Sequence, residues 1–204
     1  MKYSYLALFL IALILLSSSI MQEKEKPIFG LSNGTIYMWI FRYIHFVIFL
    51  FTSFYLLFFM GTGTETDKYL LLITILGVVS CWYIFGCCWL SYVELLFYNI
   101  ELDKVKTTVN TTFMFSFGSW DRIVLNLSGL LYLLNVCVVL YSSTSLSLLF
   151  KIAYFIVFIG FFLQEIYTTT YKECYYDKNH NKPMELLHNI HQSCFAPNYN
   201  QHII

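Results

Sequence analysis

One apolar stretch sets the structural class of this protein: YLLLITILGVVSCWYIFGCCWLSYVELLFY, residues Tyr69–Tyr98, in which Glu94 is the only charged side chain. At about 1.5 Å of rise per residue, a single helix of this length exceeds the ~30 Å hydrocarbon core of a bilayer. It would therefore tilt or push one end into the headgroups. Small residues, which let helices approach closely in lipid, recur along it: Gly77, Ser80, Cys81, Cys87, Cys88 and Ser91. We expect one long central helix of a membrane bundle.

Composition supports a membrane protein. The 204 residues are 58% hydrophobic, 20% aromatic and 12% charged, whereas a soluble domain carries about 25% charged residues. The formal net charge of zero gives no argument for a nucleic-acid partner. The sequence therefore predicts an all-α membrane protein.

Four further apolar runs flank the central stretch. The predicted spans are 3–20, 36–60, 69–98, 123–141 and 146–167, a bundle of about five transmembrane helices. The first run could also be a signal segment, but we expect it to be a retained helix. The connection Glu101–Trp120 is rich in Thr, Val and Phe and is compatible with a short β-hairpin. The polar C-terminal tail, 168–204, is expected to contain a short amphipathic helix that starts near Pro183.

The lysines and arginines predict an orientation, because positive charge collects on the inner side of a membrane. With five spans, one side holds nine of them: Lys24, Lys26, Arg42, Lys104, Lys106, Arg122, Lys172, Lys178 and Lys182. The other side holds Lys2, Lys68 and Lys151, of which Lys151 has no expected partner. The N-terminus is thus expected outside and the tail inside.

Five polar side chains lie near the inner ends of the spans: Arg42, His45, Glu94, Glu165 and Arg122. A charged group at this depth is costly unless it is paired or hydrated, so each is a candidate functional residue. Arg42 and Glu94 sit at similar depths in neighbouring spans and can form an ion pair. We favour a structural pair; the alternative is a proton relay with Glu94 and Glu165 as carriers and His45 as the titrating group.

Two groups of residues are candidate cofactor sites. His45 alone resembles the haem-ligating histidines of the membrane anchors of succinate dehydrogenase, and a haem here would need its second ligand from another subunit. In the tail, Cys174, His188, His191 and Cys194 could hold zinc, or the two cysteines could form a disulfide. No cofactor is predicted, although bound phospholipid is expected.

The chain shows no phosphate-binding loop and no catalytic motif, so we expect no catalytic activity of its own. The favoured function is a structural or accessory integral-membrane subunit of a larger complex. The alternatives are a small ion- or proton-conducting transporter subunit, or a haem- or quinone-type anchor of an oxidoreductase.

The abundance of Phe, Tyr and Cys with few charges resembles divergent subunits of mitochondrial inner-membrane complexes, the respiratory chain or ATP synthase. That resemblance implies integral-membrane partner subunits, lipids such as cardiolipin, an N-terminus in the intermembrane space and a C-terminus in the matrix. It favours this membrane over the endoplasmic reticulum.

Overall fold

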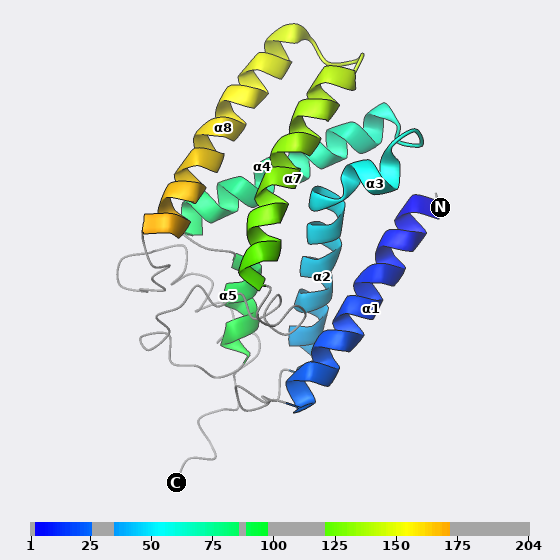
Figure 1. Ribbon diagram of the computed structural model, residues 1–204, viewed down its shortest axis with the longest axis vertical. Coiled ribbons are helices and arrows are strands. Elements are labelled where there is room, and N and C mark those ends of the chain that lie inside the picture. Colours follow the sequence, from blue (N-terminus) through cyan, green and yellow to red (C-terminus); the bar gives the residue numbers. More distant parts are fainter. Residues whose placement is uncertain (1–2, 26–34, 86–88, 98–120, 172–204) are drawn as a thin grey trace.

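The computed structural model describes residues 3–25, 35–85, 89–97 and 121–171 (Figure 1). These residues form helices and turns and contain no strand. The helices are α1 (Tyr3–Glu25), α2 (Thr35–Ser53), α3 (Tyr55–Phe59), α4 (Glu65–Phe85), α5 (Trp89–Leu96), α7 (Asp121–Ser142) and α8 (Leu148–Tyr171). The connection Glu101–Trp120 and the tail from 172 onward lie outside the described residues, and so does the proposed hairpin.

The helix at the centre is α2, which packs against α1, α3, α4, α5 and α7. Large apolar side chains on several of its faces form the core with residues of α1, α3, α4, α7 and α8. The buried members include Phe46, Phe49, Leu50, Leu8, Ala12, Phe59, Leu71, Ile75, Val136, Val139, Tyr154 and Phe158. The expectation that Tyr69–Tyr98 is the central helix is therefore corrected.

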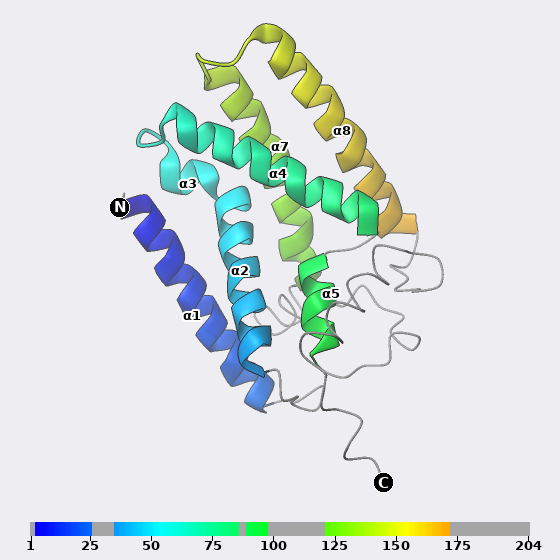
Figure 2. The ribbon, with the colours of Figure 1, turned by 180° about the vertical axis from the view of Figure 1, so that it is seen from behind.

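That stretch also contains two helices where the sequence predicted one. Helix α4 ends at Phe85 and α5 begins at Trp89, and Figure 2 shows α4 running obliquely across the bundle while α5 is nearly upright. The two pack on different partners, α4 mainly on α8 and α5 on α2. A straight helix could not reach both.

The small residues do not form a close helix contact at Gly77. A Cβ built on Gly77 would meet nothing within 4 Å, so this glycine faces away from the other described helices. Ser80 and Cys81 are half-buried, and Cys87, Cys88 and the side chain of Ser91 lie outside the described residues.

The predicted span 36–60 is interrupted near Phe54, where α2 ends and α3 begins. Asn135 of α7 donates hydrogen bonds from its side-chain amide to the carbonyl oxygens of Thr52 and Ser53, at 2.6 and 2.9 Å. Thr52 also donates its hydroxyl to the carbonyl of Ile48, a bond that tends to bend helices. The buried carbonyls at the break are thereby satisfied.

Turn chemistry sets the remaining boundaries. Gly61 adopts φ +82°, a left-handed conformation that ends the segment after α3. Helix α4 starts at a capping box, in which Asp67 accepts from the backbone N–H and hydroxyl of Thr64. Ser147 caps α8 by accepting from the N–H of Phe150.

Two of the described helical segments are long and apolar enough to cross a membrane, Tyr3–Glu23 and Ile36–Ser53. Leu127–Ser142 and Leu148–Leu163 are shorter apolar helices. Of the five predicted spans, two thus coincide with described helices that have the length and composition to cross a membrane.

Candidate functional site: an arginine buried between two glutamates

The most unusual side chain in the core is Arg42, which is 0% exposed. Its Nε donates to Oε1 of Glu94 at 2.8 Å, and its Nη2 donates to the same oxygen. Its Nη1 donates to Oε2 of Glu23 at 2.8 Å and to the hydroxyl of Ser19 at 3.4 Å. We call Ser19, Glu23, Arg42 and Glu94 the arginine cluster.

The cluster joins three helices that are far apart in sequence. Glu23 and Ser19 come from α1, Arg42 from α2 and Glu94 from α5. Glu23 and Glu94 are 3% and 1% exposed, so the two carboxylates and the guanidinium leave water together. Burying charges is tolerated when the geometry pairs them and further hydrogen bonds occupy their polar atoms. Here four hydrogen bonds leave the guanidinium, three to carboxylate oxygens and one to the hydroxyl of Ser19.

Helical spacing places each residue of the arginine cluster on the buried face of its helix. On α1, Leu8, Ala12, Ser19 and Glu23 follow one another at steps of four, seven and four residues, and all four are buried. On α2, Arg42 follows buried Met38 by four residues. On α5, Glu94 lies beside Val93 and three residues before Phe97.

Apolar and aromatic side chains pack beside the cluster. Met38, Val93 and Phe97 form a separate buried group with Trp39, Phe41 and Trp89 against it. The rings of Phe41 and Phe97 lie 6.1 Å apart. This packing covers α2 and α5 where the ion pair joins them, which strengthens the electrostatic interaction by lowering the local dielectric.

His45 lies one turn beyond Arg42 on α2 and is also buried, at 7% exposure. Glu165 and Arg122 lie in α8 and α7, but their side chains are outside the described residues. The structure therefore brings together Arg42 and Glu94 of the predicted set, with His45 close by on the same helix. Cys174, His188, His191 and Cys194 lie outside the described residues.

Sequence reasoning missed Glu23, because the predicted first span ended at residue 20. The structure extends α1 to Glu25, and this extension places Glu23 against Arg42. The signal was present: Glu23 continues the buried stripe of Leu8, Ala12 and Ser19 at helical spacing.

A second polar group lies where the start of α1, the turn 60–64 and the turn 143–147 meet; we call it the hairpin end. There Glu65 accepts hydrogen bonds from Lys68 and from the hydroxyls of Ser143 and Ser145. The hydrogen bonds from Lys68, then from Ser143 and Ser145, lower the pKa of Glu65 to about 2.

Lys68, Lys151 and helix α1 also make hydrogen bonds at the hairpin end. Lys68 donates to the carbonyl of Ser142 at 3.0 Å, and Lys151 donates to that of Ser143 at 2.6 Å. Lys151 is therefore not isolated, contrary to the expectation from sequence. Tyr5 of α1 donates its hydroxyl to Asp67 at 2.6 Å. Side-chain hydrogen bonds thus fasten α1, α4, α7 and α8 together at this end.

Chemically, the arginine cluster can hold helices in register or exchange protons between carboxylates. Among the described residues, no three His, Cys, Asp or Glu side chains lie together as a metal site would need. Comparisons of the chain with protein families, with curated proteins and with solved structures give no match.

Proposed function

We propose that this chain is an integral-membrane protein with a structural role in a larger membrane assembly. The observation that carries the proposal is the combination of a charged side chain in the core with wide apolar surface on the outside of the bundle. Arg42 is fully buried, whereas Leu148, Leu149 and Ile156 on α8 are 73%, 78% and 65% exposed. A water-soluble protein of this size rarely exposes such wide apolar surface, because that surface is costly in water.

The exposed apolar side chains extend over most of the bundle, which suits a lipid environment on several sides. They include Leu10 and Ile14 of α1, Ile36 and Ile40 of α2, Leu70 and Ile73 of α4, and Leu127, Leu130 and Leu134 of α7. In lipid, these faces contact acyl chains or the helices of other subunits. The proposal therefore includes the five-span bundle, with α4, α7 and α8 crossing beside α1 and α2.

A structural role is favoured because four hydrogen bonds of the Arg42 guanidinium end on side chains of the bundle itself. Glu23, Glu94 and Ser19 take its Nε, Nη1 and Nη2 donors. A cluster of this kind fixes the relative depth of α1, α2 and α5, since sliding any helix by one turn would break it.

We further propose a hetero-oligomeric complex of the mitochondrial inner membrane, of the respiratory-chain or ATP-synthase type. Composition supports this assignment, because the chain combines 20% aromatic and 12% charged residues. Such a subunit would contact other membrane-embedded subunits and phospholipids such as cardiolipin.

A proton relay is the second candidate, favoured by the burial of two carboxylates and His45 with Arg42. The part of α2 that follows His45 argues against a relay. Thr52 lies seven residues after His45, which is about 10 Å along the helix. The buried side chains between them are Phe46, Phe49, Leu50 and Phe51. Apolar side chains thus interrupt a proton path along this helix.

The test is the mass of the chain after extraction of membranes with a mild detergent. The proposal predicts a native complex many times the mass of the chain, with the same integral-membrane subunits co-purifying in repeated preparations. A stable and monodisperse monomer would count against the structural role. Recovery in the soluble fraction without detergent would overturn the membrane assignment.

A further inference from the structure

Three exposed tyrosines lie next to the hairpin end. Tyr3 is at the start of α1, Tyr69 is near the start of α4 and Tyr141 is close to the end of α7. They are 90%, 36% and 91% exposed. Because tyrosine joins an apolar ring to a polar hydroxyl, surroundings that are partly apolar and partly polar suit it best.

Hydrogen bonds place the three tyrosines at one level of the bundle. Each is the sequence neighbour of a residue that bonds within the hairpin end: Ser4, Lys68 and Ser142, respectively. The hydroxyl of Ser4 lies 3.3 Å from that of Thr62, and Lys68 donates to the carbonyl of Ser142 at 3.0 Å. Figure 1 shows the start of α1, the turn before α4 and the turn between α7 and α8 along the same end of the bundle.

The lysines of the hairpin end carry their charges to this level. Lys151 lies in the first turn of α8 beside exposed Leu148, yet its ammonium group reaches back to the carbonyl oxygen of Ser143 at 2.6 Å. That carbonyl adjoins the Ser142 carbonyl to which Lys68 donates. Lysines near the ends of membrane helices bend in this way, because the charge then reaches hydrated headgroups while the alkyl chain stays in apolar surroundings.

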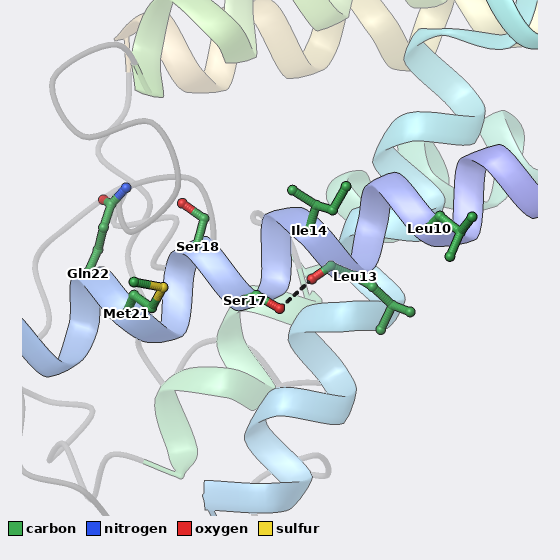
Figure 3. A pocket seen from close by; sticks show the side chains of 7 residues that line it. All are labelled: Leu10, Leu13, Ile14, Ser17, Ser18, Met21 and Gln22. Carbon is green, nitrogen blue, oxygen red and sulfur yellow. Dashed lines mark hydrogen bonds between the residues drawn. The ribbon is translucent and has the colours of Figure 1, made fainter.

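The outward face of α1 changes from apolar to polar with distance from the hairpin end. Leu10, Ile14, Ser18 and Gln22 follow one another at four-residue spacing along the hollow drawn in Figure 3. The first two side chains are aliphatic, and the last two carry a hydroxyl and an amide. From Tyr3 to Gln22 the helix rises about 29 Å, which is close to the ~30 Å thickness of a hydrocarbon core.

We infer that the hairpin end lies in one headgroup layer of a phospholipid bilayer and that Tyr3, Tyr69 and Tyr141 contact the headgroups there. The inference rests on the proposed function and adds the depth of the bundle. Tyrosine is enriched where membranes meet water. The rings come from three helices, which fits a layer that meets the whole end of the bundle. The arginine cluster then lies near the opposite headgroup layer, since Glu23 directly follows Gln22.

The test measures the depth of these positions in the full-length chain, reconstituted in phosphatidylcholine vesicles. After the six native cysteines are replaced, Tyr3→Cys, Tyr69→Cys and Tyr141→Cys each receive one fluorescent label. Lipids that carry a nitroxide either on the headgroup or near the end of an acyl chain quench the label according to its depth. At all three positions the headgroup nitroxide should quench more strongly than the acyl-chain nitroxide.

The matched control is Ile156→Cys, at an exposed apolar position further along α8. Its label should show the opposite order, with stronger quenching by the acyl-chain nitroxide. If the control behaves so, two results for the tyrosine positions would overturn the inference and leave the membrane assignment intact. Stronger quenching by the acyl-chain nitroxide would place the hairpin end in the hydrocarbon, and quenching by neither lipid would place it in water or against protein. A label at position 156 that neither lipid quenches would contradict the proposed function itself.

Discussion

Arg42 directs two of its nitrogens, Nε and Nη2, to the same carboxylate oxygen of Glu94. The pair joins α2 to α5 across 52 positions of sequence, and both side chains are almost fully buried. Because the interior offers the guanidinium no water, the ion pair makes the position of α5 dependent on α2.

Removing the Glu94 carboxylate should destabilise the bundle strongly. Glu94→Ala leaves a buried arginine without its main acceptor, and breaking a buried pair in this way costs about 3–5 kcal/mol. Glu94→Gln keeps a carbonyl oxygen as acceptor and should cost less. Thermal unfolding of the detergent-solubilised protein measures the difference. An unchanged unfolding temperature in Glu94→Ala would contradict the geometry.

Removing all three charges should restore much of that loss. The combined variant Glu23→Leu, Arg42→Met and Glu94→Leu replaces the ions with apolar groups of similar length, an exchange that is often neutral. We expect it to unfold at a higher temperature than Glu94→Ala and to assemble normally. Intact assembly with loss of proton movement in reconstituted vesicles would favour the relay instead.

Two glycines should respond in opposite ways to the same substitution. A Cβ at Gly63 would lie 3.0 Å from the carbonyl oxygen of Phe59 and 3.0 Å from the hydroxyl of Tyr55. Gly63→Ala therefore crowds both groups and should destabilise the turn. Gly77→Ala meets nothing within 4 Å in the middle of α4 and should stabilise by about 0.5–1 kcal/mol. Chemical unfolding of the two variants side by side checks both signs. A larger loss in Gly77→Ala than in Gly63→Ala would show that Gly77 makes a contact after all.

Acid should loosen the hairpin end. The pKa of Glu65 is lowered from 4.5 to about 2, so its carboxylate binds Lys68 and the serines more strongly in the folded state than in the unfolded state. This contribution is fully present above pH ~4.5 and is lost as the pH falls toward 2. Hydrogen exchange of the amides near Ser143 should therefore rise between these pH values. In Glu65→Gln the exchange should already be fast and should not change over that range; a wild-type profile in that variant would refute the assignment.

The helical class and the Arg42–Glu94 pair could be predicted from the sequence. The class follows from the apolar runs, and the pair follows from the depth of the two residues within their predicted spans. Apolar runs fix which segments are helical, and the predicted starts at 123 and 146 lie within two residues of those of α7 and α8. Arg42 and Glu94 fall at equal depths if the spans alternate, which places them within reach of each other.

The departures come from tertiary contacts that have no local signature. The division of Tyr69–Tyr98 depends on which helices its two halves meet, and the break near Phe54 is stabilised by Asn135, more than 80 residues away. Glu23 was missed because a charged residue that follows an apolar run is usually part of a loop. Its burial depends on Arg42, which is 19 positions away in the sequence.

The most direct test of the account is the environment of α8 in a lipid bilayer. Spin labels at Ile156, which is 65% exposed, and at Phe158, which is 0% exposed, can be introduced singly after the six native cysteines are replaced. The account predicts that the label at 156 collides readily with oxygen and hardly at all with a water-soluble nickel chelate, while the label at 158 is immobile and reached by neither. Ready collision of the nickel chelate with the label at 156 would contradict it, because the exposed apolar face would then meet water rather than lipid.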